Sequence, residues 1–258
     1  MRTRLSTLVL LAAFSAGAAF GEVRIAERIG AKPDEQLSFL DSAGKPVSLR
    51  AFTKDTPVTI LTLVYYRCPA ACTLLLDGLV ASLKHSGFAL GEDYKVVTIS
   101  VDDRESSALC AAKQSTYHDA LGLASGHEKR AWPFLTGDRA SIQSLTEEIG
   151  YGYRYDPDTM QYEHPSALIF LNQDSSVVRY LYGNYFQPEQ FRFAFIEAAN
   201  GQLGTFSENL LLKLMSYNQP ETGRRYGYNV WKVTLAILIA CFPFIFITIV
   251  FFRRTRSV

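Results

Sequence analysis

The sequence feature that most constrains the fold is a pair of cysteines between a predicted strand and a predicted helix. Residues Val58 to Val64 are apolar or β-branched without alternation, which predicts a buried strand. A helical pattern runs from Leu74 to Lys84. Cys68 and Cys72 stand between them, four residues apart, so both side chains share one helix face. A helix N-terminus lowers the pKa of a thiol, and the resulting thiolates bind soft metals or exchange disulfides.

Both ends of the chain carry targeting patterns. Residues 1–20 combine early arginines, a short apolar run and small residues near Ala18, which is typical of a secretory signal peptide. An uncleaved anchor is the alternative. Residues 230–252 are predicted to form a transmembrane helix, because the uncharged stretch from Val233 to Phe252 matches the roughly 20 apolar residues that span a bilayer. We therefore expect an inner (cytoplasmic) membrane protein with its soluble part on the periplasmic or extracytoplasmic side and residues 253–258 as a cytoplasmic tail.

The composition argues against two classes of protein. A formal net charge of +1 argues against nucleic acid as a partner, since such binding favours a basic face. The 4 cysteines are too few for a disulfide scaffold. Export would place them in an oxidising compartment, where a reactive pair can form a disulfide.

Residues 21–204 are predicted to form one α/β domain. The predicted strands are Val58–Tyr65, Lys95–Val101, Trp132–Leu135, Tyr151–Tyr155, Ser166–Leu171 and Val177–Tyr182. The predicted helices are Leu74–Lys84, Ser107–Tyr117, one from Asp138 to Ile149 and Pro188–Ala199, with a hairpin at Asp41–Gly44 and a polar loop at Gly122–Arg130. The order βαβ…ββα is that of a thioredoxin-like fold with inserted helices. Residues 205–229 are expected to form an amphipathic helix and a linker to the membrane.

Cys68 and Cys72 need a third ligand if they hold a metal; the alternative is a structural disulfide, or one buried cysteine beside one without a role. Soft thiolates with an imidazole suit copper, whereas structural zinc normally has four protein ligands. Of the 4 histidines, His85 and His118 are predicted to be solvent-facing at helix ends, and His127 lies in the charged loop. His164 enters the late hairpin, which in a thioredoxin-like arrangement faces the start of the first helix. His164 is therefore the candidate third ligand, and an exposed turn histidine is the alternative.

Other residues near the cysteines are assigned structural roles. One of Tyr65 and Tyr66 is expected to cover the sulfurs, and the other to lie in the core. Cys110 is expected to be a buried small residue, and Cys241 to be inert within the predicted span. Asp102, Asp103 and Glu105 are predicted to lie in a solvated loop with a helix-capping role, and the alternative is that they shield or receive a metal.

Together these motifs resemble the Sco/SenC family. The resemblance covers about Gln36 to Ala199 and rests on C-P-x-x-C after a strand, the triplet Ser100-Val101-Asp102 and a lone histidine before the late hairpin. Proteins of this family are thioredoxin-like, membrane-tethered copper proteins that help to metallate the dinuclear copper centre of cytochrome c oxidase. The resemblance implies that Cys68, Cys72 and His164 bind copper (Cu⁺ or Cu²⁺).

The sequence departs from the family pattern at three places. Ala70 and Ala71 stand where an acidic residue is usual between the cysteines, and Thr73 replaces the usual proline. The predicted anchor is C-terminal, whereas the usual anchor is N-terminal. These differences concern metal retention and the choice of partner more than the fold.

Two functions remain open at this point. The first is a copper metallochaperone, not a turnover enzyme, whose partners are the copper-centre subunit of cytochrome c oxidase and a thiol reductant or copper donor protein. In it, a Cys68–Cys72 disulfide would release the metal. The second is a thiol–disulfide oxidoreductase acting on exported proteins, which has no need of His164. A sensor that signals through the tail is disfavoured, because the six residues after Phe252 are too few for a signalling domain.

Overall fold

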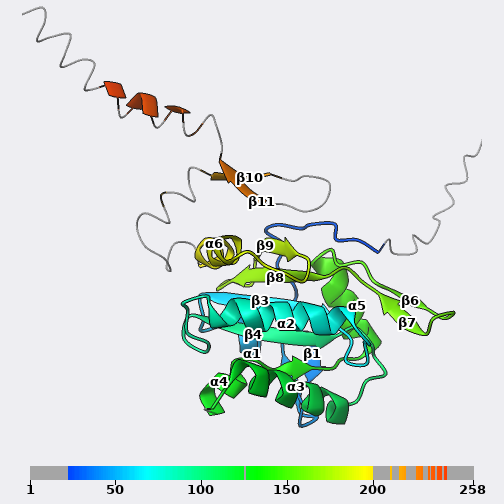
Figure 1. The fold of residues 1–258 in the computed structure, drawn as a ribbon. Helices are drawn as coiled ribbons and strands as arrows, with labels where there is room; N and C mark the ends of the chain where they lie inside the picture. The colour runs from blue at the N-terminus through cyan, green and yellow to red at the C-terminus, as the bar shows by residue number, and fades with distance from the viewer. Residues whose placement is uncertain are drawn as a thin grey trace, which may run out of the picture.

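The fold is built on a five-stranded sheet with the strand order β5-β4-β3-β8-β9 (Figure 1). The computed structural model describes residues 23–124, 126–199, 210, 215–218, 225–228, 232, 234, 235, 237–239, 241 and 242. The strands of this sheet are β3 (Val58–Val64), β4 (Tyr94–Ser100), β5 (Phe134–Leu135), β8 (Ala167–Asn172) and β9 (Val177–Tyr182). β3, β4 and β5 run parallel, whereas β8 is antiparallel to both β3 and β9.

Helices join and cover these strands (Figure 1). They are α1 (Arg50–Thr53), α2 (Ala71–Lys84), α3 (Ser107–Leu121), α4 (Gly126–Arg130), α5 (Arg139–Glu148) and α6 (Pro188–Ala198). All residues of β3 are buried, as expected for a central strand covered on both faces. α2 makes the crossover between the parallel strands β3 and β4, and α6 closes the fold after the β8–β9 hairpin. The predicted βαβ…ββα order is therefore confirmed.

Aromatic side chains of the core pack the closing helix α6 against strands β4 and β8. Phe195 of α6 packs on Tyr94 of β4 with ring centroids 4.9 Å apart, and on Phe170 of β8 at 5.5 Å. All three side chains are at most 2% exposed. Because these aromatic contacts link segments far apart in sequence, they hold the late hairpin against the βαβ unit that carries the cysteines.

Small two-stranded pairs lie outside the main sheet. They are β1 (Ser38–Leu40) with β2 (Pro46–Ser48), β6 (Arg154–Asp156) with β7 (Gln161–Glu163), and β10 (Met215–Asn218) with β11 (Arg225–Tyr228). The β1–β2 hairpin confirms the turn predicted at Asp41–Gly44. β6 overlaps the end of the strand predicted at Tyr151–Tyr155, but its partner β7 was not predicted. β10 and β11 were missed, because they lie where a helix end and a linker were expected. Strands of three or four residues are too short to show a period in the sequence.

Other predictions need correction or concern residues outside the described part of the chain. The predicted polar loop at Gly122–Arg130 contains the short helix α4, which has no apolar face that a pattern could reveal. Among the described residues, no helix has the length and apolar character needed to cross a membrane. The predicted signal peptide (1–20), most of the predicted span (230–252) and the tail (253–258) lie outside the described residues, so those assignments remain predictions.

Candidate metal centre

The loop between β3 and α2 is held by a buried carboxylate. Glu105 accepts hydrogen bonds from the backbone N–H of Tyr66 at 2.7 Å and of Arg67 at 2.8 Å. Ser100 Oγ donates to the same carboxylate at 2.6 Å. The side chain of Glu105 is only 6% exposed, so this carboxylate acts as an internal clamp on the loop. The clamp fixes the backbone immediately before Cys68.

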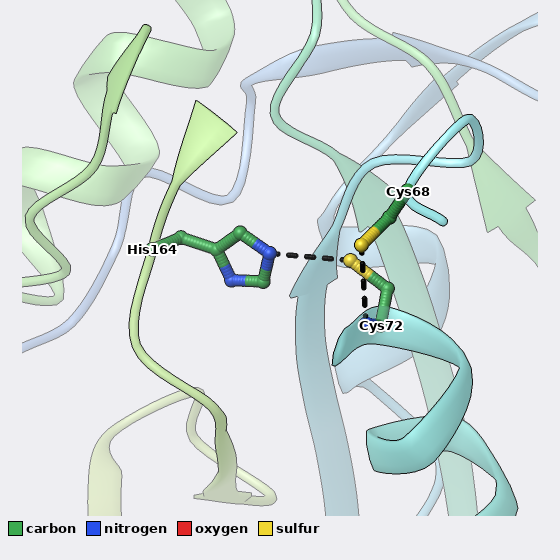
Figure 2. Close-up of side chains that lie close together, drawn as sticks. All are labelled: Cys68, Cys72 and His164. Atoms are coloured by element: carbon green, nitrogen blue, oxygen red, sulfur yellow. Dashed lines mark hydrogen bonds between the residues drawn. The ribbon is translucent and has the colours of Figure 1, made fainter. Parts of the chain in front are cut away.

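Cys68, Cys72 and His164 converge on one point (Figure 2). Their candidate ligand atoms, two sulfurs and one imidazole nitrogen, all lie within 4.8 Å of one another. His164 Nε2 is 3.2 Å from Cys72 Sγ, and the backbone N–H of Cys72 donates to Cys68 Sγ at 3.3 Å. Cys72 lies in the first turn of α2, Cys68 lies in the loop before it, and His164 lies between β7 and β8. The structure therefore brings together all three residues named from the sequence.

Two tyrosines hold the imidazole of His164. Tyr65 meets the ring edge-on, with centroids 5.8 Å apart and an interplanar angle of 85°. Tyr151 stacks on it at 29°, and its hydroxyl lies 3.0 Å from His164 Nδ1. Nε2 of His164 faces the sulfurs and can bind a metal. Nδ1 faces the hydroxyl of Tyr151, within hydrogen-bond distance.

Burial and hydrogen bonding shift the pKa values of the two thiols in opposite directions. Burial raises the pKa of Cys68, but hydrogen bonds from the backbone N–H groups of Cys72 and Ala70 outweigh it, and the pKa lies below its ordinary value. Burial raises the pKa of Cys72 far above its ordinary value. Burial also lowers the pKa of His164. The metal-free centre is therefore expected to hold a neutral Cys72 thiol against a neutral imidazole, with Cys68 as the readier thiolate.

A shallow cavity of about 540 Å³ opens onto this centre. Tyr65, Cys68, Pro69, Tyr162 and His164 are among its lining residues. Cys68 is 8% exposed, whereas Cys72 is fully buried. A metal ion or a partner thiol can thus approach from the Cys68 side.

The donor set fits a soft metal ion. Two thiolates and one imidazole suit copper(I), which tolerates low coordination numbers. A structural zinc site would need a fourth protein ligand, and no further histidine, cysteine or carboxylate of the described chain belongs to this group. The residues present therefore match copper better than structural zinc.

The other histidines do not join the centre. His85 is exposed, as predicted. The prediction that His118 faces solvent is wrong, because it is 4% exposed and its Nε2 lies 2.8 Å from the carbonyl oxygen of Trp132. His127 lies on α4 and lines a separate cavity together with Lys129. The side of α3 that packs on Trp132 was not visible in its weakly amphipathic sequence.

The acidic stretch after β4 is also more buried than predicted. Asp102 is 3% exposed and pairs with Arg104 at 2.7 Å, and Glu105 serves as the loop clamp. A solvated loop was therefore the wrong description for both carboxylates. The cap of α3 is instead Ser106, whose hydroxyl accepts a hydrogen bond from the N–H of Leu109.

The predictions for Tyr65, Tyr66 and Cys110 are confirmed. Tyr65 lines the centre, whereas Tyr66 lies in the core and donates to the carbonyl oxygen of Leu135 at 2.6 Å. Cys110 is fully buried and its pKa is raised by burial to about 11. Cys241 is exposed where the structure describes it, and its expected inertness within the predicted span stays a prediction. Tyr151, which contacts His164, was missed, since its sequence signal is only one tyrosine among several.

Comparison with solved structures shows the same fold in several proteins. A proposed electron transfer protein from Aquifex aeolicus VF5 is 20% identical, with a TM-score of 0.59 over 68% of this chain and 96% of the other. ScoI of Arabidopsis thaliana, solved with copper bound, is 19% identical, with a TM-score of 0.53 over 66% of this chain and 98% of the other. A SCO1/SenC family lipoprotein from Bacillus anthracis str. Ames is 15% identical, with a TM-score of 0.53 over 69% and 98%.

Two further comparisons use the sequence instead of the structure. A search of curated proteins finds no match. The model of the SCO1/SenC family matches residues 26–195, which is more than half of the chain. That range includes both cysteines, His164 and the whole central sheet. The chain belongs to the SCO1/SenC family.

Proposed function

We propose that this protein is a copper metallochaperone that holds one copper ion between Cys68, Cys72 and His164. The observation that carries the proposal is the convergence of two sulfurs and one imidazole nitrogen within 4.8 Å. Family membership and the copper held by the Arabidopsis relative support the choice of metal. Three protein ligands beside an open cavity leave copper accessible for transfer to a partner.

Copper binding would depend on the redox state of Cys68 and Cys72. In forming a Cys68–Cys72 disulfide, the two thiolates lose two electrons, and a disulfide of an exchange partner accepts them and is released as two thiolates. The new sulfur–sulfur bond removes both thiolate ligands, so copper is released. The reduced form, with both cysteines as free thiols, would be the form that binds copper.

The proposed recipient is the copper-centre subunit of cytochrome c oxidase, to which the protein would deliver copper or whose thiols it would maintain. The Sco/SenC motifs in the sequence support this partner. The predicted signal peptide and C-terminal span support a location at the inner membrane with the copper site on the extracytoplasmic side. A thiol reductant or copper donor protein would complete the cycle.

A copper titration tests the copper proposal. The full-length protein is purified in detergent, reduced under anaerobic conditions and titrated with copper(I) against a chelator of known affinity. We expect about one copper per chain. The double variant Cys68→Ser/Cys72→Ser should lose this copper, whereas His85→Ala, which alters an exposed histidine at the opposite end of α2, should keep it. Stoichiometric copper in the double variant would overturn the proposal.

A specific observation also favours a second function, thiol–disulfide exchange. Cys68 is slightly exposed with a lowered pKa, and Cys72 is buried with a raised pKa, which is the asymmetry of an attacking and a resolving thiol. His164→Ala separates the two functions in cells. A metallochaperone should then fail to load the oxidase with copper, whereas an oxidoreductase should still reduce its partner disulfides.

A further inference from the structure

The hydroxyl of Tyr151 lies among three polar atoms behind His164. Its Oη is 3.0 Å from His164 Nδ1, 2.6 Å from the carbonyl oxygen of Pro165 and 3.2 Å from that of Leu63. The side chain is 3% exposed, so bulk water does not compete for these contacts. The two rings lie at an interplanar angle of 29° with their centroids 6.4 Å apart.

We assign the protons of this group from the contact distances. A tyrosine hydroxyl donates one hydrogen bond and can accept others. The carbonyl oxygen of Pro165 is a pure acceptor and makes the shortest contact, so it receives the hydroxyl proton. His164 Nδ1 must then be the donor in its 3.0 Å contact with Tyr151 Oη. A neutral imidazole with its proton on Nδ1 has a free lone pair on Nε2, the nitrogen that lies 3.2 Å from Cys72 Sγ.

We propose that Tyr151 is a positioning residue for the copper site: its hydroxyl accepts the Nδ1 proton of His164 and directs the Nε2 lone pair to the sulfurs. The inference rests on the proposed function and deepens it by adding a residue behind the third ligand. A hydrogen-bond acceptor behind a ligating histidine fixes its tautomer and ring orientation and makes the other nitrogen more basic. Without it, the imidazole could place its proton on Nε2 and would then present no lone pair to a metal.

A second possible acceptor of the Nδ1 proton lies close to His164, and the test must distinguish it from the hydroxyl of Tyr151. The carbonyl oxygen of Pro165 lies 3.1 Å from His164 Nδ1 and could hold the Nδ1 proton alone. Tyr151→Phe removes the hydroxyl and leaves this carbonyl in place. Tyr180→Phe is the matched control, because Tyr180 is fully buried and its hydroxyl donates to the backbone carbonyl of Ile149 at 2.7 Å and accepts from the backbone N–H of Arg28 at 3.2 Å. Both variants remove one buried hydroxyl that lies within hydrogen-bond distance of a backbone carbonyl.

The test measures the tautomer and the metal affinity of the full-length protein. Nitrogen-15 NMR of the reduced, metal-free protein assigns His164 by comparison with His164→Ala and reports which ring nitrogen is protonated. We expect the Nδ1–H form in the wild type and in Tyr180→Phe, and a mixture with Nε2–H in Tyr151→Phe. Copper(I) competition should show affinity falling about 10- to 100-fold in Tyr151→Phe, as for other partners of metal-ligating histidines. Tyr180→Phe should bind copper as the wild type does.

Several results would overturn the inference. One is a wild-type His164 that is mainly protonated on Nε2, which can be read even if Tyr151→Phe does not fold. Another is a Tyr151→Phe protein with an unchanged tautomer, whatever its affinity, since the carbonyl of Pro165 would then suffice. Absence of copper from the wild type would contradict the proposed function, while the NMR comparison would still decide whether Tyr151 sets the tautomer of His164.

Discussion

His164 Nε2 lies 3.2 Å from Cys72 Sγ, although 92 residues separate the two in the sequence. The sheet topology explains the contact. β8 runs antiparallel to β3, and Thr62 near the end of β3 pairs with Leu168 near the start of β8. The segment that leads into β8 therefore lies beside the loop that leaves β3, and these segments carry His164 and the cysteines.

The two cysteines should differ in reactivity. Because the pKa of Cys68 is lowered and that of Cys72 is raised, alkylation of the reduced, metal-free protein should modify Cys68 faster, beginning at a lower pH than for an ordinary thiol. Mass spectrometry of the separated peptides distinguishes these sites from the exposed Cys241. Equal rates at Cys68 and Cys72, or a faster Cys72, would contradict the proposed asymmetry.

Replacing Glu105 with glutamine should destabilise the loop between β3 and α2, which carries Cys68. Glu105→Gln replaces one acceptor oxygen with an amide group that cannot accept from the loop N–H groups or from Ser100. We expect the free energy of unfolding to fall by about 1–3 kcal/mol, measured by chemical denaturation, because a buried donor loses its partner. Alkylation of Cys68 should also become faster. Asp103→Asn, which alters an ion pair with the exposed Arg139, is the control and should change both quantities much less.

Gly78 should not tolerate a methyl group. A Cβ atom on this residue of α2 would lie 1.9 Å from the carbonyl oxygen of Asn184, which is backbone and has little freedom to move. Gly78→Ala should therefore destabilise the protein by about 1–3 kcal/mol, although alanine favours a helix. Gly126→Ala in α4 is the control, since its nearest contact would be a side-chain atom of Arg130 at 3.4 Å. A thermal unfolding curve of Gly78→Ala at or above that of the wild type would show that α2 does not pack as described.

His118 should make stability depend on pH. Burial lowers the pKa of His118 in the folded protein, so its contribution is fully present above the unfolded value of about 6.5 and is lost as the pH falls toward the folded value. His118→Gln can still donate to the carbonyl of Trp132 but does not titrate. Between about pH 7 and about pH 5, the unfolding free energy of the wild type should therefore fall more steeply than that of His118→Gln. His164 contributes with the same sign, so some slope should remain; parallel curves would show that His118 takes up a proton freely in the fold.

Much of the central sheet could be predicted from the sequence because its strands are long and continuously apolar. β9 was predicted with its observed bounds, and β3, β4 and β8 to within one residue. The short pairs β6–β7 and β10–β11 could not be predicted, since their stability comes from contacts between strands. Tyr155 and Tyr162, for example, face each other with ring centroids 5.1 Å apart.

The three residues of the candidate ligand set could also be predicted, whereas the residues that contact and position them could not. Cys68, Cys72 and His164 are rare residue types at positions that the fold order brings together. Glu105 and Tyr151 belong to common types, and their roles depend on hydrogen bonds to backbone and ring atoms. No sequence period reports such contacts, so the buried carboxylate was taken for a solvated one.

The central claim is that copper is held by two cysteine sulfurs and one histidine nitrogen. X-ray absorption spectroscopy of the reduced, full-length protein loaded with one equivalent of copper(I) tests it most directly. The account predicts two sulfur scatterers and one imidazole nitrogen in the wild type, and loss of the imidazole contribution in His164→Ala. A first shell without sulfur, or an imidazole signal that persists in His164→Ala, would contradict it.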